Sequence, residues 1–558
     1  MIKKIRVEVW FLPLLCLFIL ITPSQSQEIP PTGAVASAHP LATRAGLNIL
    51  NSGGNAFDAA VAVASSLAVV EPYSSGIGGG GFFLVFDNKK KSYIFIDARE
   101  TAPGAAFPDM YLKKDGKFDR LKSLNGPLAA GIPGLPAGLV HLSKKYGKKS
   151  LSECFKEAID LAENGFEVGP RYLRMAGFRK KSFVGEAKEI FLGGTDLSLG
   201  ERIVQKDLAS TLRSIASDNA SSFYNGSLAE RLVSGVKQHG GIWDKSDLSS
   251  YTVIERTPLY GKYEGVKIIS APLPSSGGIV LLQSLNILRN YELGILQETD
   301  RIHVITEAMR RAYRDRADFL GDPDYNDIDV KQMISLRYAD QLASDIKMGL
   351  ATPSDSLKGL TIEKGKDTTH FSVLDKEGNR VAATLSINYP FGASFVVPGT
   401  GVLLNNEMDD FSASPLAPNA YGLVGNHANS IQPGKRPLSS MTPTFLESND
   451  RIGIIGTPGG SRIISMVLIS SLEFVDGKLP AAWVKKERFH HQYMPDILQF
   501  EKDAFNPSLQ QDLEKRGHEL KEIDRKYGNM HAILWDKSRG KVYAASDPRG
   551  EGLAELQK

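Results

Sequence analysis

Two hydroxyl side chains occupy facing positions in a predicted hairpin of the last third of the chain. Residues 367–374 and 380–388 have the pattern of two strands joined by a turn centred near Glu377. Residues whose numbers sum to 754 then lie opposite each other, so that Thr368 faces Ser386. Opposed residues have Cβ atoms about 4.5–5.5 Å apart, close enough for a hydrogen bond between the two hydroxyls. Threonine-rich strands are also common without any such role.

A second pattern could stabilise negative charge. A short apolar strand, residues 451–456, passes through Gly459 and Gly460 into the apolar helical run 463–472. Backbone N–H groups at a helix N-terminus stabilise an anion, including the oxyanion of a reaction intermediate, and glycines permit close approach of the backbone. An ordinary strand-to-helix turn has the same pattern.

Three carboxylates fall within four residues at 407–410. Glu407 and Asp410 are three residues apart, so on a helical turn they share a face, which suits an ammonium ligand. A calcium loop is disfavoured because the spacing and the glycine of an EF-hand are missing. A solvated acidic turn remains the alternative. Ser439 and Ser440 supply two adjacent hydroxyls in a loop next to Pro437, which alone indicates nothing specific.

Several familiar sites are excluded by their missing residues. The glycine run 76–81 lacks the Gly-Lys-Ser/Thr ending of a phosphate loop and enters a predicted strand instead of a helix. The sequence has no dinucleotide fingerprint, no zinc-spaced Cys/His cluster and no Gly-x-Ser-x-Gly elbow. We therefore expect no cofactor and no metal, and we interpret the adjacent His490 and His491 as surface residues.

The elements that must position these groups are helical early and strand-rich late. Residues 34–71 read as alanine-rich helix, and 82–87 with 92–99 as an antiparallel hairpin that ends at Arg99. Residues 140–350 are mostly amphipathic helix. Residues 348–366 form the best linker candidate, because they are rich in turn formers and lack sustained periodicity.

Composition narrows the class of protein. The chain has 558 residues, 42% of them hydrophobic and 23% charged, which is typical of a globular protein. Its net charge of +3 gives no support for binding nucleic acid.

Residues 1–26 resemble a secretory signal peptide, with Lys3 and Lys4 before an apolar run of 13 residues and cleavage expected before Gln27. No other stretch approaches the length of a membrane span, so we expect an exported protein, periplasmic or secreted, with no membrane span after signal removal. The mature chain keeps one cysteine, Cys154, which we interpret as a buried small hydrophobic residue.

Together these motifs resemble the γ-glutamyltransferases, also called γ-glutamyl transpeptidases or glutathione hydrolases, a family of N-terminal-nucleophile hydrolases. The resemblance covers nearly the whole mature chain and is densest in five motifs, TTHFS, LLNNEMDDFS, YGLVG, KRPLSSMTPT and GTPGGSRI. It implies an α+β fold, a four-layer αββα sandwich with two antiparallel sheets between helical layers.

The resemblance also implies self-processing. The precursor would cut itself between Asp367 and Thr368, giving a large subunit, 27–367, and a small subunit, 368–558, that stay together as a heterodimer in one interwoven unit. Thr368 would then be the nucleophile, and its new α-amine the base. Ser386 matches a residue that is usually threonine and bonds to the nucleophile. Gly459 and Gly460 match the amides of the oxyanion hole.

The family's substrate-binding positions carry over residue by residue. Arg99, Ser439 and Ser440 match groups that bind the α-carboxylate of the substrate, where a guanidinium can bind in a bidentate way. Glu407 and Asp410 match the acids that hold its α-ammonium. The resemblance further includes the binding residue Asn388 and, in the segment similar to a lid loop, Tyr421.

The leading hypothesis is therefore an exported, self-processing γ-glutamyltransferase acting on glutathione and related γ-glutamyl amides, with water or amino-acid and peptide amines as acceptors. A related glutaryl-type acylase, as in cephalosporin acylases, is the enzyme alternative, and would leave Glu407 and Asp410 without a ligand. The non-enzyme alternative is an exported amino-acid or peptide binding protein.

Overall fold

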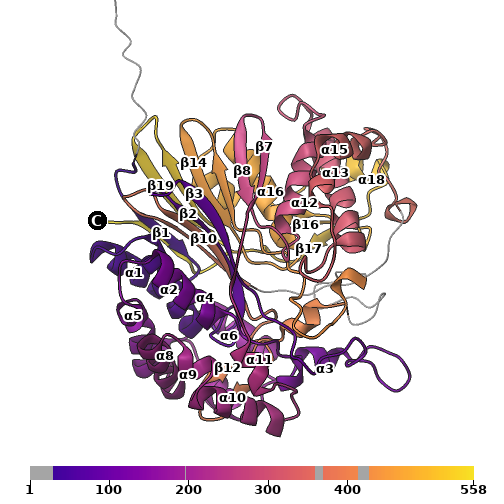
Figure 1. Ribbon diagram of the computed structural model, residues 1–558. Helices are drawn as coiled ribbons and strands as arrows, with labels where there is room; N and C mark the ends of the chain where they lie inside the picture. The colour runs from indigo at the N-terminus through magenta and orange to yellow at the C-terminus, as the bar shows by residue number, and fades with distance from the viewer. Residues whose placement is uncertain (1–28, 195–196, 358–367, 413–426) are drawn as a thin grey trace, which may run out of the picture.

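The computed structural model describes residues 29–194, 197–357, 368–412 and 427–558. Two antiparallel sheets lie face to face at its centre, and helices cover their outer faces (Figure 1). This confirms the four-layer αββα sandwich. The expected signal peptide, Asp367 and Tyr421 lie outside the described residues. Within the described ranges, none of the helices combines the length and the hydrophobicity needed to cross a bilayer.

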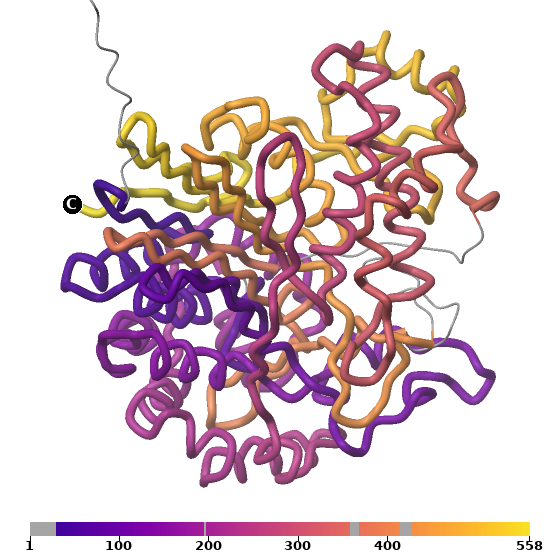
Figure 2. The backbone as a smooth tube through the Cα atoms, turned by 45° about the horizontal axis from the view of Figure 1, so that its top comes forward, coloured from indigo at the N-terminus to yellow at the C-terminus, as the bar shows by residue number. Residues whose placement is uncertain are grey.

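The first sheet has seven strands, in the spatial order β20 (Leu553–Leu556), β1 (Ala34–Ser37), β9 (Thr369–Leu374), β10 (Arg380–Ser386), β2 (Gly80–Asp87), β3 (Ser92–Ala98) and β6 (Ile254–Arg256). The second has six, in the order β19 (Lys541–Ser546), β18 (His531–Asp536), β14 (Arg451–Gly456), β13 (Thr444–Glu447), β8 (Val266–Ser270) and β7 (Leu259–Tyr263). Each sheet thus combines strands from both sides of the Asp367–Thr368 bond, and Figure 2 shows β9 and β10 lying between the indigo strands β1 and β2.

Alternation along the strands divides the core. In β2, Phe83 and Val85 point to the helical layer, whereas Phe82 and Leu84 point to the core shared with the second sheet. Because successive side chains of a strand point to opposite faces, one apolar strand can bury both of its faces between layers.

Three helices of the N-terminal half cover the first sheet (Figure 1): α1 (Pro40–Asn51), α2 (Ala56–Val70) and α4 (Leu135–Tyr146). Behind them, α5 (Leu151–Asn164) packs on α2 and α8 (Lys206–Asp218) packs on α5, whereas α10 (Ser227–Gln238) lies further from the sheet. Cys154 of α5 is buried in this layer, as expected. The second sheet is covered by α12 (Gly277–Leu288), α13 (Glu298–Phe319), α15 (Leu336–Ala343), α16 (Arg462–Val475), α17 (Pro480–Lys485) and α18 (Pro507–Lys515).

Shorter elements join these layers. They are the helices α3 (Arg120–Leu124), α6 (Pro170–Arg179), α7 (Glu186–Leu192), α9 (Ser221–Tyr224), α11 (Lys245–Ser249) and α14 (Val330–Met333), and the strand groups β4 (Phe166–Glu167) with β5 (Arg202–Ile203), β11 (Val396–Val397) with β12 (Val402–Leu403), and β15 (Phe489–His490) with β16 (Leu498–Glu501) and β17 (Leu520–Ile523).

Three sequence expectations need correction. Ala34–Ser37, expected as the start of a helix, is strand β1, because it pairs with both β9 and β20. The middle of the chain also contains β6, β7 and β8 among its helices. His490 and His491 are buried and not on the surface, because Ser465 Oγ bonds to His490 Nδ1 at 2.9 Å and Asp496 Oδ1 to His491 Nε2 at 3.0 Å.

Candidate active site

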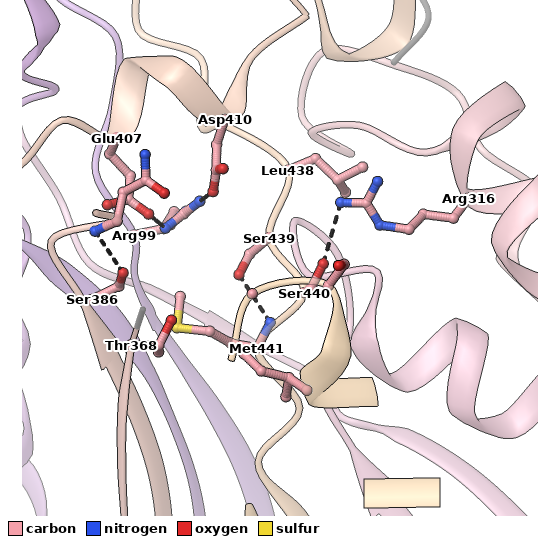
Figure 3. A pocket seen from close by; sticks show the side chains of 14 residues that line it. Arg99, Arg316, Thr368, Ser386, Glu407, Asp410, Leu438, Ser439, Ser440 and Met441 are labelled. Atoms are coloured by element: carbon pink, nitrogen blue, oxygen red, sulfur yellow. Dashed lines mark hydrogen bonds and ion pairs between the residues drawn. The ribbon is translucent and has the colours of Figure 1, made fainter. Parts of the chain in front are cut away.

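The expected site residues converge on one cavity between the two sheets and α13 (Figure 3). Eight of them line it: Arg99, Thr368, Ser386, Asn388, Glu407, Asp410, Ser439 and Ser440. Gly460 lines it as well, and Gly459 lies directly before Gly460 in the same turn. Residues more than 300 positions apart in the sequence therefore form one site.

The hairpin β9–β10 places Thr368 and Ser386 at the cavity. Six pairs along the hairpin, from Arg380 with Leu374 to Leu385 with Thr369, have numbers that sum to 754, which confirms the expected register. The turn is fixed by Asp375, whose Oδ1 accepts the N–H of Asn379 at 2.9 Å. Because a slip of one residue would move every side chain of the strand to the other face of the sheet, this turn and the buried apolar residues together fix the pairing.

Thr368 and Ser386 are both buried and both line the cavity (Figure 3). Ser386 Oγ accepts the N–H of Asn388 at 2.7 Å. The hydroxyl proton of Ser386 has no acceptor among the described residues, Thr368 included, so it remains available as a donor at the cavity. Asn388 has a φ of 69° and donates its Nδ2–H to the carbonyl of Asn406 at 2.9 Å, which ties the end of the hairpin to the acidic turn.

The strand-to-helix turn after β14 is built as expected. Gly459 and Gly460 have φ angles of 141° and 58°, in the region that favours glycine, and α16 begins two residues later at Arg462. A Cβ at Gly459 would lie 2.8 Å from Met466 Cε. The N–H groups of both glycines have no acceptor within the described ranges, so they remain available to an anion at the start of α16.

Arg99 forms the charged end of the cavity together with the acidic turn. It follows β3 directly and donates to Glu407 Oε1 and, at 2.6 Å, to Asp410 Oδ2. Glu407–Asp410 is one turn of 3₁₀ helix, in which residues three apart eclipse each other, so both carboxylates reach the same guanidinium. The two acids thus share a face, as the spacing predicted.

Three carboxylates share the Arg99 guanidinium, since Glu100 Oε2 also lies 3.6 Å from it. Burial raises the pKa of Glu407 well above its ordinary value and that of Glu100 to about 7, with repulsion from neighbouring carboxylates adding to both. Burial opposes the charge of Arg99, but Glu407 and Asp410 outweigh it and raise its pKa. The carboxylates of the cluster are therefore protonated more readily than ordinary ones, whereas Arg99 keeps its proton.

The glycine run 76–81 supports this site, although the sequence indicated no role for it. A Cβ at Gly78 would lie 2.1 Å from the carbonyl oxygen of Leu403, and one at Gly79 would lie 2.2 Å from that of Ser386. Asn405 adds a further tie, because its Nδ2–H donates to the carbonyl of Gly78 at 2.7 Å. The run lets the backbone before β2 pack directly against the segments that carry the site.

Sequence reasoning missed five cavity-lining residues, which are Arg316, Leu438, Met441, Ser461 and Ile463. Four of them lie within the motifs KRPLSSMTPT and GTPGGSRI, where no residue type singled them out. Arg316 stands in a helix with four other arginines, Arg301, Arg310, Arg311 and Arg314, and no pattern in the sequence distinguishes it from them.

A family model described as gamma-glutamyltranspeptidase matches residues 42–556 of the chain. The chain belongs to the gamma-glutamyltranspeptidase family. It is therefore a γ-glutamyltransferase. A glutathione hydrolase proenzyme of Escherichia coli (strain K12) is 40% identical over 527 residues, which cover 93% of this chain and 90% of the relative. An acylase ACY 1 proenzyme of Pseudomonas sp. (strain V22) is 34% identical over 552 residues, 94% of each chain.

Solved structures agree with this membership. The cephalosporin acylase of Bacillus halodurans superposes with a TM-score of 0.84 at 29% identity, covering 94% of this chain and 96% of that one. A Helicobacter pylori gamma-glutamyltranspeptidase gives a TM-score of 0.56 at 42% identity, covering 58% of this chain and 94% of the other. The transpeptidase fold is thus shared with acylases, and residues of the site must distinguish the substrates.

Proposed function

We propose that this transferase cuts its own chain before Thr368 and then cleaves the γ-glutamyl amide of glutathione and related compounds. One observation carries the proposal: Thr368 lines the same cavity as Arg99, Glu407 and Asp410. A γ-glutamyl group carries a carboxylate and an ammonium at one end and a reactive carbonyl at the other. The cavity offers a cation with two acids at one end and a hydroxyl at the other.

In the self-cleavage step, Thr368 Oγ attacks the carbonyl carbon of the preceding residue, Asp367. The peptide C–N bond breaks, the nitrogen takes up the proton that the Thr368 hydroxyl loses and becomes the α-amine of Thr368, and an ester links the two residues. Water then hydrolyses the ester, leaving the subunits 27–367 and 368–558. Because both sheets contain strands from each subunit, we expect the two to remain associated as a heterodimer.

In turnover, the freed α-amine acts as the base. Its reference pKa of about 7.7–8.0 leaves a useful neutral fraction near pH 7. Thr368 Oγ attacks the γ-carbonyl of the substrate, the amide nitrogen leaves with the proton, and a γ-glutamyl ester forms on Thr368. Water releases glutamate from this ester, whereas an amino-acid or peptide amine forms a new γ-glutamyl amide.

The chain's own groups stabilise this chemistry. The N–H groups of Gly459 and Gly460, at the start of α16, stabilise the negative charge that develops on the attacked carbonyl oxygen by donating hydrogen bonds to it. The Ser386 hydroxyl, fixed by Asn388, donates to Thr368 Oγ and keeps it aimed at the carbonyl carbon. These groups act on the reacting atoms and therefore govern kcat more than KM.

Substrate recognition uses the charged end of the cavity. Arg99, with Asn388, Ser439 and Ser440, binds the α-carboxylate, and Glu407 and Asp410 bind the α-ammonium. When substrate binds, the bonds between Arg99 and the two acids would be replaced by bonds from Arg99 to the substrate carboxylate and from the substrate ammonium to the acids. The total charge of the site therefore stays balanced. Tyr421, which lies outside the described residues, is proposed as a further substrate-binding residue because its segment is similar in sequence to a lid loop.

Residues 1–26 are proposed to direct export and to be removed before Gln27, giving a periplasmic or secreted enzyme. Fractionation of the producing cells, with N-terminal sequencing of the large subunit, tests this separately. An N-terminus at Met1 in the cytoplasmic fraction would contradict export and leave the catalytic proposal standing.

The decisive assay compares γ-glutamyl-anilide with glutaryl-anilide, which lacks the ammonium. We expect a preference for the γ-glutamyl compound, because Glu407 and Asp410 both face the cavity. A preference for the glutaryl compound would instead support the acylase alternative suggested by the Bacillus halodurans and Pseudomonas relatives. Binding of glutamate without any turnover would support a binding protein.

A further inference from the structure

Arg316 of α13 is a buried arginine that lines the cavity without an ion-pair partner. Its exposed fraction is 4%, and within the described residues no carboxylate oxygen lies within 4.0 Å of its guanidinium. Two neighbours on the same helix behave differently, since Arg310 and Arg311 each bond to Glu307. An unpaired guanidinium in a buried position is costly, so its environment requires an explanation.

The guanidinium holds the loop that contains the two adjacent serines. Arg316 Nε donates to Ser276 Oγ at 2.9 Å, and Nη2 donates to Ser440 Oγ at 3.3 Å. Ser276 Oγ in turn donates to the carbonyl of Ser439 at 2.7 Å. One side chain from α13 thus fixes both consecutive serines, one directly and one through Ser276.

The hydroxyl oxygens of Ser439 and Ser440 each accept a hydrogen bond from the protein, which leaves each hydroxyl proton free to donate elsewhere. Ser440 Oγ accepts from Arg316, and Ser439 Oγ accepts the N–H of Met441 at 3.1 Å. A hydroxyl has one proton to donate, and across the described part of the chain neither proton has an acceptor. Both side chains line the cavity, so both present donors to it, between Arg99 on one side and Arg316 on the other (Figure 3).

Arg99 and Arg316 differ in whether carboxylates compensate their charge. The charge of Arg99 is compensated by Glu407, Asp410 and Glu100. Burial lowers the pKa of Arg316 to about 10, so it remains charged at neutral pH. A run of donors backed by a cation that has no ion-pair partner among the described residues is complementary to an anion, and a carboxylate is the anionic group of a γ-glutamyl substrate.

We propose that Arg316 is a positioning residue for the α-carboxylate of the substrate, which it serves by holding the Ser440 hydroxyl as a hydrogen-bond donor that faces the cavity. The proposal rests on the proposed function. It predicts that carboxylate recognition in this enzyme depends on a residue of α13 that acts through the serine loop.

A double-mutant cycle on the processed enzyme tests the dependence, with γ-glutamyl-anilide as substrate. Arg316→Gln and Ser440→Ala should each raise KM about 10-fold with kcat changed less than about threefold, because a charge-assisted contact to bound substrate is lost. In the Ser440→Ala background, Arg316→Gln should add less than about threefold. Full additivity, or a loss confined to kcat, would overturn the proposal.

Two further variants separate positioning from folding. Arg179 is also buried, and among the described residues it has no carboxylate partner; it bonds to Ser394 Oγ at 2.8 Å but does not line the cavity. Arg179→Gln should therefore lower Tm without raising KM. If Arg316→Gln fails to process, Arg316→Lys keeps the charge but cannot hold both Ser276 and Ser440, and should raise KM severalfold. An unchanged KM in Arg316→Lys would contradict the proposal.

The wild-type enzyme distinguishes this proposal from the one on which it rests. Turnover of γ-glutamyl-anilide by the wild type supports the proposed function whatever the variants do. Absence of turnover by a processed wild type would contradict the proposed function itself, whereas normal KM values in both Arg316 variants would contradict only the role of Arg316.

Discussion

Replacing Asp410 with asparagine isolates recognition of the substrate ammonium. Asp410 Oδ2 lies 2.6 Å from Arg99 Nη2, and its side chain is 11% exposed at the cavity. Asparagine keeps the shape and one acceptor oxygen, so Arg99 retains a partner while the negative charge is lost. Glu407 remains as the other acid, so we expect weaker binding of the ammonium and not its complete loss.

The magnitude follows from the contact that is lost. A hydrogen bond to a charged group contributes about 1.5–3 kcal/mol, which corresponds to roughly 10–150-fold in kcat/KM. The loss should fall mainly on KM, because the ammonium lies far from the reacting carbonyl. For glutaryl-anilide, which has no ammonium, kcat/KM should be unchanged or higher, since Arg99 loses a competing carboxylate.

The measurement is therefore the ratio of kcat/KM for the two anilides. Asp410→Asn should lower the preference for the γ-glutamyl compound by at least about 10-fold. Asp409→Asn is the matched control, because Asp409 belongs to the same turn but bonds to Ser123 Oγ at 2.6 Å and does not line the cavity. An equal loss on both substrates in Asp410→Asn, or the same change of ratio in the control, would refute ammonium recognition by Asp410.

Three further outcomes are expected. Ser386→Ala should lower kcat about 10-fold or more with KM little changed, because Thr368 loses a donor; steady-state kinetics with an unchanged kcat would contradict this. Gly79→Ala places a Cβ 2.2 Å from the carbonyl oxygen of Ser386, so it should destabilise the protein by about 1–3 kcal/mol and impair self-cleavage, whereas a normal Tm and complete processing by gel would disagree. Burial lowers the pKa of His491 to about 4 and of His518 to about 3, so between pH 4 and 6.5 the unfolded chain binds more protons than the native protein. Tm should therefore fall on acidification through this window, and less steeply in His491→Gln; equal slopes would count against the assignment.

The hairpin of the nucleophile could be predicted because its pattern is local. A turn centred near Glu377 between two apolar strands fixes the pairing, and the observed register is the expected one. The turn at Gly459 and Gly460 was predictable for the same reason, since strand, glycines and helix are consecutive in the chain.

Features that depend on distant neighbours could not be predicted in this way. The strand Ala34–Ser37 is set by pairing with residues more than 300 positions away, and its small residues also suit a helix. His491 bonds to the nearby Asp496, but it is buried because more distant residues such as Arg310 of α13 also surround it. Arg316 reaches the cavity from an arginine-rich helix, so only the packing of α13 on the serine loop reveals it.

The intact mass of the purified protein after denaturation tests self-processing most directly. We expect two chains, the smaller beginning at Thr368, and a single uncut, inactive chain for Thr368→Ala. Recovery of only one full-length chain from the wild type, or a cut and active Thr368→Ala variant, would contradict the account of Thr368 as the nucleophile.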